Sequence, residues 1–156
     1  MNKTALSLAL AGISALPAIS QAREIHLTTT LQEYRGNEAY LAIYVTDAQG
    51  VYQRTLWVAG KKAKYYRHLR DWAQGGGNRP AEFDGLTGAS VGSGETLEVA
   101  VELEDALIDA GYQIRIDSAV EDKRDNRGEI QVPLSSQATS VKGGGQGYID
   151  SFGYSF

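Results

Sequence analysis

The stretch AYLAIYVTDAQGVYQRTLWVAG, residues 39–60, consists of two runs rich in β-branched and aromatic residues with a short polar segment between them. The polar segment, DAQG at residues 47–50, has the composition of a turn, because aspartate and glycine suit backbone conformations that reverse the chain. Two strand-like runs joined by about four residues that include a glycine are typical of a β-hairpin. The sequence therefore predicts two antiparallel strands here, and hence a β-sheet protein.

Strand patterns recur on both sides of this hairpin. Apolar residues such as Ile25, Leu27 and Leu31 alternate with polar residues before it, as expected for a strand that is buried on one face. Similar runs follow at residues 95–104, from Tyr112 onward, at 130–134 and at 148–156, whereas 121–129 reads as a charged loop. About seven or eight strands in a chain of this kind predict an all-β fold, an immunoglobulin-like β-sandwich.

One segment has a helical period instead. In KKAKYYRHLRDWAQ, residues 61–74, Tyr65, Leu69 and Trp72 recur at positions i, i+4 and i+7 among lysines and arginines. We expect one amphipathic helix, inserted in the sandwich and ended by the glycines that follow. Residues 74–93 should then form a long loop, and long loops in compact domains are often functional.

The first residues have the features of an export signal. Residues 1–22 contain Lys3, then an apolar run, then small residues before Arg23, which is the pattern of a secretory signal peptide cleaved after Ala22. The apolar run is too short and too interrupted for a strong membrane-spanning helix, so we expect no membrane insertion of the mature chain. A chain of 156 residues favours one domain. The prediction is a periplasmic protein whose single β-sandwich domain spans residues 23–156.

The composition excludes several classes of function. The absence of cysteine rules out disulfides, thiolate zinc sites and CxxCH haem attachment. The formal net charge of −4 argues against nucleic acid as a partner. The only two histidines, His26 and His68, do not make a convincing metal site. Redox chemistry in this chain would require an organic cofactor.

The motif DGLTGAS, residues 84–90, lies in the expected long loop and allows three interpretations. As a plain turn it needs only its glycines and Asp84. As part of G-x-S-x-G it would present Ser90 as a nucleophile, but that motif requires a following helix and a later histidine, whereas a strand is expected after Ser90 and both histidines precede it. A triad with an unrelated chain order stays open. A calcium loop from Asp84 to Glu95 is rejected, because the positions between them lack the required side-chain oxygens.

The third interpretation is a cofactor attachment site. Five residues fit the pattern D-x-x-[ST]-G-A-[ST]: Asp84, Thr87, Gly88, Ala89 and Ser90. This pattern resembles the acceptor site of the periplasmic FAD:protein FMN transferases, which implies that FMN is joined through its phosphate to the Ser90 hydroxyl in a phosphoester bond. The small residues beside Ser90 leave its oxygen open to a bulky dinucleotide. A serine hydroxyl is a weak nucleophile, and Asp84 is the only obvious base within the loop.

More of the chain is similar to the predicted periplasmic proteins grouped as DUF2271. The likeness runs from about Glu24 to the C-terminus and is strongest between Tyr40 and Ser90. Members of that family tend to be found with flavin transferases and PepSY-type membrane proteins, which implies a role in extracytoplasmic electron transfer. This chain departs from the family pattern in carrying Ser90 where threonine is commoner, which keeps the hydroxyl. It also reads LEVAVELEDALIDAG where a tryptophan-containing stretch is expected.

Two hypotheses from different classes follow. In the first, the chain is an exported flavoprotein that carries FMN on Ser90 and acts as a redox carrier, being the substrate of a flavin transferase rather than an enzyme. In the second, the chain is an unmodified periplasmic β-sandwich that binds a partner, and residues 84–90 are only a turn.

The residues near the expected helix receive a structural interpretation. Its lysines and arginines are expected to form a solvated face, although one of these cations could screen the FMN phosphate. Trp57, Tyr65, Tyr66 and Trp72 are expected to belong to the core, although a flavin ring near them would gain from aromatic packing.

Overall fold

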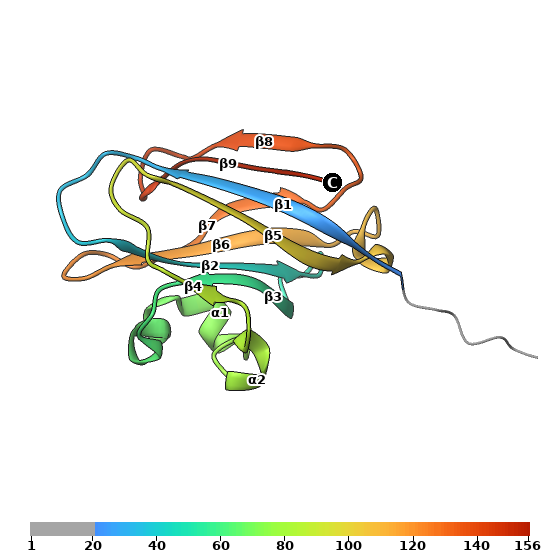
Figure 1. Ribbon diagram of the computed structural model, residues 1–156, viewed down its shortest axis with the longest axis horizontal. Coiled ribbons are helices and arrows are strands. Elements are labelled where there is room, and N and C mark those ends of the chain that lie inside the picture. Colours follow the sequence, from blue (N-terminus) through green and yellow to red (C-terminus); the bar gives the residue numbers. More distant parts are fainter. Residues whose placement is uncertain (1–20) are drawn as a thin grey trace, which may run out of the picture.

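Two β-sheets face each other across the main hydrophobic core, and the computed structural model describes them within residues 21–156. Sheet A contains, in spatial order, β5 (Thr96–Glu104), β1 (Ala22–Leu31), β9 (Ile149–Ser155) and β8 (Thr139–Lys142). Sheet B contains β4 (Thr87–Gly88), β3 (Tyr52–Ala59), β2 (Ala39–Thr46), β6 (Gln113–Val120) and β7 (Asn126–Pro133). Figure 1 shows the two sheets as the layers of a sandwich. The predicted all-β sandwich is confirmed.

The pairing of the central strands follows the immunoglobulin-like pattern. β1 pairs with β5 in sheet A and β2 pairs with β6 in sheet B, in both cases antiparallel, as strands B with E and C with F are neighbours in that fold. β3 and β7 extend sheet B on either side of this pair. The C-terminal strand β9 lies beside β1, in the place that the N-terminal strand A takes in immunoglobulin domains.

The hairpin expected over residues 39–60 is present as β2 and β3. In its turn, Asp47 Oδ1 accepts hydrogen bonds from the backbone N–H groups of Gln49 and Val51, both at 2.9 Å. Gly50 has φ of +84°, a conformation that residues with a Cβ rarely adopt. The polar segment therefore turns the chain for the reasons that the sequence indicates.

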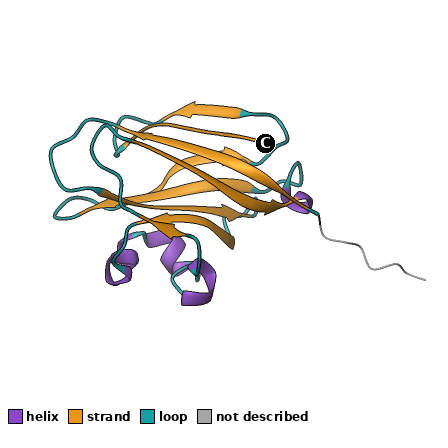
Figure 2. Cartoon of the chain, viewed as in Figure 1, coloured by secondary structure: helices purple, strands orange, loops and turns teal. Residues whose placement is uncertain are grey.

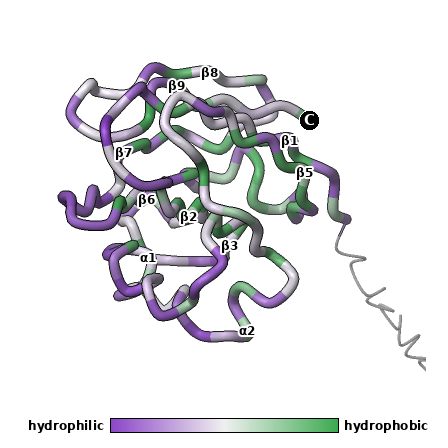
Figure 3. The backbone as a smooth tube through the Cα atoms, turned by 60° about the vertical axis from the view of Figure 1, so that its left-hand side comes forward, coloured by the Kyte–Doolittle hydropathy of each residue, from purple (hydrophilic) through white to green (hydrophobic). Residues whose placement is uncertain are grey.

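The main core lies between the two sheets. Ile25 and Leu27 of β1 pack there with Leu41 and Ile43 of β2, and all four side chains are at most 1% exposed. Burial of each such side chain stabilises the fold by about 1.5–3 kcal/mol. Figure 3 shows hydrophobic stretches along the strands and mostly hydrophilic residues in the helical segments and connections.

A second, smaller core lies on the outer face of sheet B. It is closed by three short helical segments, which Figure 2 shows together on one side of the sandwich: η1 (Ala63–His68), α1 (Arg70–Gln74) and α2 (Pro80–Phe83). The Tyr66 ring meets the rings of Trp72 and Phe83 edge to face, with centroids 5.7 and 5.2 Å apart. Because both faces of sheet B are covered, β2 is buried along almost its whole length.

The prediction of one continuous helix over residues 61–74 is wrong. The chain leaves helical geometry at Leu69, which has φ of −82° and ψ of 79°, so a 3₁₀ helix is followed by a separate α-helix. The buried side chains are Tyr66, Leu69 and Trp72, and their three-residue spacing suits a tight 3₁₀ turn. The backbone N–H of Trp72 donates to Asp117 Oδ2 on β6 at 2.8 Å, which replaces the bond a continuous helix would supply.

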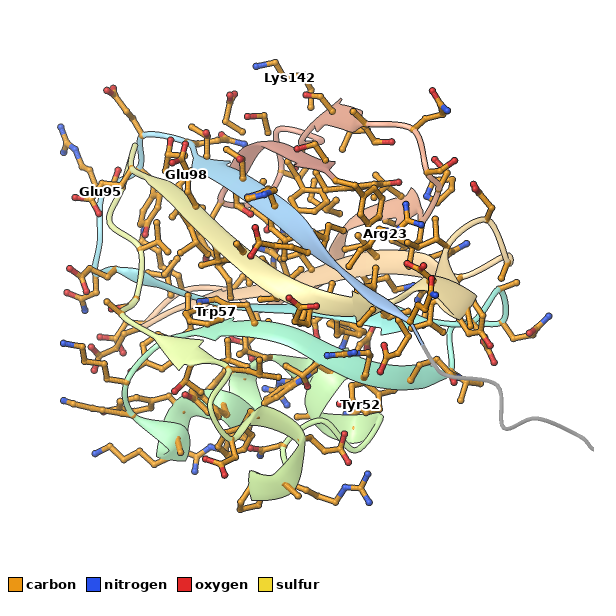
Figure 4. The ribbon with its side chains drawn as sticks, turned by 45° about the vertical axis from the view of Figure 1, so that its right-hand side comes forward. Arg23, Tyr52, Trp57, Glu95, Glu98 and Lys142 are labelled. Carbon is orange, nitrogen blue, oxygen red and sulfur yellow. The ribbon has the colours of Figure 1, made fainter. Side chains whose placement is uncertain are left out.

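The segment expected as a long loop, residues 74–93, is also more regular than predicted. It contains α2 and the short strand β4, which runs parallel to the end of β3. Tyr52, labelled in Figure 4 on the helical side of β3, fixes α2 by donating its hydroxyl proton to Glu82 at 2.9 Å. Burial is the main cause that raises the pKa of Tyr52 to about 12. β7 likewise begins at Asn126, inside the stretch expected as a charged loop.

The predicted signal peptide lies largely outside the described residues. β1 begins at Ala22, one residue before the expected mature N-terminus Arg23. Within residues 21–156, the structure has no helix with the length and apolar character needed to cross a membrane.

Candidate functional site

The motif DGLTGAS, which we call the acceptor segment (residues 84–90), crosses one end of sheet B. After a turn at Gly85, whose φ is +73°, the carbonyls of Leu86 and Gly88 accept hydrogen bonds from the β3 side, each at 2.8 Å. Immediately after Ser90, Val91 exchanges two backbone hydrogen bonds with Ala39 at the start of β2, at 2.7 and 3.0 Å. The backbone on both sides of Ser90 is therefore held in place.

Gly88 is required by packing rather than by backbone conformation. A Cβ atom at this position would lie 2.7 Å from Cζ2 of Trp57, closer than real Cβ contacts come. Figure 4 labels Trp57, which packs at the edge of the core between the sheets. The small residue lets the acceptor segment lie directly on the indole ring.

A cavity of about 810 Å³ opens beside Ser90, and we call it the Ser90 cavity. The segments around it meet at one end of the sandwich, on the left in Figure 1. Its lining residues are Asn37, Glu38, Tyr40, Lys61, Lys62, Tyr65, His68, Ala89, Ser90, Ala119, Val120, Glu121, Asp122, Lys123 and Asp125. A volume of this size falls within the range of small-molecule sites, roughly 300–1,000 Å³.

The structure separates the five residues of the predicted motif. Ala89 and Ser90 line the cavity, and Ser90 is partly exposed. Gly88 lies against Trp57, while Asp84 and Thr87 are exposed and do not line the cavity. The attachment role of these residues stays a prediction, because the structure describes the protein alone.

Glu38 is the residue that sequence reasoning missed. The Ser90 hydroxyl donates a hydrogen bond to Glu38 Oε2, across 52 positions of sequence. Glu38 directly precedes β2, whose first residue is bridged to Val91, so sheet pairing brings the carboxylate to the hydroxyl. A carboxylate in this position orients the hydroxyl and can accept its proton. The acidic partner suggested by the sequence, Asp84, makes no such contact within the described part of the chain.

The charged groups around the cavity differ in their partners. Asp125 is paired with Arg70 at 2.8 Å and with His68 at 3.2 Å. No ion pair involving the lining lysines Lys61, Lys62 and Lys123, or the lining acids Glu121 and Asp122, is found among residues 21–156. The cavity therefore offers a ligand charges of both signs, with the lysines as its positive groups.

Two tyrosines form an aromatic part of the wall. The rings of Tyr40 and Tyr65 meet edge to face with centroids 5.8 Å apart. The Tyr40 hydroxyl accepts a hydrogen bond from the backbone N–H of Lys62 at 3.2 Å, which fixes the chain that carries the lysines. Tyr65 is half-buried and belongs to neither core, so its predicted core role is wrong, while Tyr66 and Trp72 are core residues as expected.

The side chains around Ser90 include carboxylates, lysines and tyrosines. In the described residues, no group of three or more histidine, aspartate or glutamate side chains is arranged to hold a metal ion. Ser90 donates to Glu38, whereas the cavity-lining His68 is paired with Asp125. Unpaired lysines suit a phosphate, and tyrosine rings suit a planar ligand.

Comparison with known proteins identifies the family. No curated protein and no solved structure matches the chain. The profile of the family described as "Predicted periplasmic protein (DUF2271)" matches residues 22–151, which is most of the chain. The matched range includes β1 to β8, the first residues of β9 and the acceptor segment. The predicted periplasmic location agrees with this description and is confirmed at that level. The chain belongs to the DUF2271 family of predicted periplasmic proteins.

Proposed function

We propose that this protein is a periplasmic redox carrier that holds FMN covalently on Ser90 and receives it from a FAD:protein FMN transferase. The observation that carries the proposal is the position of Ser90, a partly exposed residue whose hydroxyl donates to Glu38 and which borders a cavity of about 810 Å³. Three lysines, Lys61, Lys62 and Lys123, line that cavity without an ion pair among residues 21–156. A PepSY-type membrane protein is the proposed electron-transfer partner.

Accessibility supports the proposal, because the hydroxyl must enter the active site of another protein. Asp84, Gly85, Thr87 and Ala89 of the acceptor segment are exposed. The hydrogen bonds that flank Ser90 hold its backbone at the surface of the domain. A transferase could therefore bind the segment without unfolding the sandwich.

The side chains around Ser90 suit the chemistry of transfer. Ser90 Oγ would form a bond to the flavin-side phosphorus of FAD, while the bond from that phosphorus to the bridging oxygen breaks and AMP leaves with that oxygen. Glu38 would take the hydroxyl proton and release it to solvent. Lys61 and Lys62 would balance the negative charge that remains on the phosphodiester.

When attached, FMN would supply the one- and two-electron chemistry that the side chains of this protein lack. The chain would position the group and adjust its electrostatic surroundings. The absence of cysteine agrees with a carrier that depends on an organic cofactor.

The test is the intact mass of the exported protein after co-production with a flavin transferase. We expect a gain of one FMN less one water, a yellow colour and a flavin-bearing peptide that contains Ser90. Ser90→Ala should abolish the gain, whereas Ser140→Ala, at an exposed hydroxyl on β8, should leave it unchanged. An unmodified wild-type mass would contradict the proposal and favour the second hypothesis, an unmodified β-sandwich that binds a partner.

A further inference from the structure

We propose that the Ser90 cavity seats the isoalloxazine ring of the attached FMN against Tyr65, with Lys61 and Lys62 beside the ring's polar edge. This inference rests on the proposed function. It adds that the flavin is held in a defined place on the sandwich instead of swinging freely in solvent on its ribityl chain.

Continuity between the attachment point and the cavity is the first argument. Ser90 and Ala89 are part of the cavity wall, so a group esterified to Ser90 Oγ starts at the cavity. The volume of about 810 Å³ is sufficient for a three-ring system of drug-like size. No movement of the sheet is needed to create this space.

The second argument is the state of Tyr65. Its neighbour Tyr66 is 2% exposed and donates its hydroxyl proton to the carbonyl of Gly60 at 2.6 Å, which gives that residue a structural role. Tyr65 instead lines the cavity, half-buried, with its ring edge to face with Tyr40. The Lys64 ammonium also lies over this ring, 4.9 Å from its centroid. Because Tyr65 belongs to neither core, packing against a planar ligand would add to its stability beyond area burial.

The third argument is charge. Lys61 and Lys62 are close to Tyr65 in the chain, line the same cavity and have no ion-pair partner in the described part of the chain. Glu121 and Asp122 also line the cavity without an ion pair among residues 21–156, and the proposal places the lysines rather than these acids beside the ring. Positive charge next to the flavin's polar edge stabilises added electrons. Binding in the Ser90 cavity would therefore favour the reduced state of the flavin. Lys62→Gln should lower the reduction potential of the attached flavin.

The experiment uses full-length protein flavinylated by co-production, with its mass measured first. Iodide quenching of the flavin fluorescence and the visible circular dichroism of the flavin are then compared with those of the flavin peptide released by proteolysis. We expect the intact protein to show several-fold weaker iodide quenching than the peptide and a distinct dichroic signal, because a seated ring is shielded and fixed.

Three variants test whether the flavin ring packs against Tyr65 in the Ser90 cavity. Tyr65→Ala should increase the quenching constant toward that of the peptide, whereas Tyr65→Phe should preserve protection because it keeps the ring. Phe156→Ala removes an exposed aromatic residue that does not line the cavity and should change nothing. Unchanged thermal unfolding midpoints would show that the variants remain folded.

The outcomes separate the two proposals. If the mass shows attachment but iodide quenches the flavin as readily in the intact protein as in the peptide, the ring is not bound in the Ser90 cavity. That result overturns the further inference and leaves the proposed carrier function standing. Equal protection in wild type and Tyr65→Ala overturns the role of Tyr65. A wild-type mass without flavin overturns both.

Discussion

At the residue scale, the site depends on a few contacts around the Ser90 hydroxyl. Gly88 allows the acceptor segment to lie on Trp57, and Glu38 accepts the hydrogen bond of Ser90. The sequence motif identifies the hydroxyl and its small neighbours. It cannot identify Glu38, because that contact joins two segments 52 positions apart through the sheet.

Gly88→Ala should destabilise the protein by about 1–3 kcal/mol, because the added methyl group would force the Trp57 ring or the acceptor segment to move. Urea unfolding measures this change in the free energy of unfolding. Gly144→Ala is the matched control, since a Cβ there meets nothing within 4 Å, and it should be close to neutral. Equal stabilities of the two variants would contradict the packing role of Gly88.

Glu38→Gln should slow flavin addition by about 100-fold or more at a fixed concentration of transferase, because the amide keeps the shape but cannot accept the Ser90 proton. The rate is measured as the growth of the flavinylated mass with time. Glu98→Gln, at an exposed position on β5 labelled in Figure 4, should have no effect. Identical rates for wild type and Glu38→Gln would show that the transferase takes the proton instead.

At the element scale, a buried carboxylate attaches the helical segments to sheet B. Asp117 of β6 is fully buried and accepts hydrogen bonds from Trp72 N, Gly128 N and Tyr44 Oη, at 2.8, 2.7 and 3.0 Å. Burial raises the pKa of Asp117 even though these three donors oppose the shift. Sequence periodicity predicted a continuous helix because it depends only on neighbouring residues and contains no information about a hydrogen-bond partner on a distant strand.

Asp117→Asn should cost about 2–3 kcal/mol, because one acceptor of the buried network becomes a donor and a buried N–H loses its partner. Tyr44→Phe removes a single donor and should cost about 1 kcal/mol. Chemical denaturation of both variants measures these costs. Hydrogen exchange should also show faster exchange of the Trp72 amide in Asp117→Asn, and unchanged exchange there would contradict the anchoring role.

At the scale of the whole molecule, two cores share one sheet, and an ion pair links the two sheets at one edge. Arg54 on β3 hydrogen-bonds Glu104 on β5, which belong to different sheets. Partial burial acts to raise the pKa of Glu104, but the hydrogen bond and charge of Arg54 outweigh it, and the pKa is lowered overall. Proton binding is therefore weaker in the folded than in the unfolded protein.

This lowered pKa predicts a pH-dependent difference between wild type and Glu104→Gln. The stabilisation from Glu104 should be present above its unfolded pKa near 4.5 and lost as the pH falls through the folded value. Because the Glu104 side chain is 43% exposed, the difference at pH 7 should be at most about 1 kcal/mol and decrease in high salt. Denaturation at pH 7 and pH 3 measures it. A difference that persists at pH 3 would contradict this origin, and Glu102→Gln, exposed on the same strand, is the control.

The sequence by itself predicted the strand segments other than β4 and β8, the Asp47 turn and the family, because alternation, turn residues and short motifs are properties of neighbouring residues. Only the tertiary structure decided that the helix breaks at Leu69, that Tyr65 leaves the core, and that Glu38 meets Ser90 beside a cavity. Each of these depends on contacts between segments that the chain brings together only when both sheets pair. Local sequence patterns do not predict such long-range hydrogen bonds and packing.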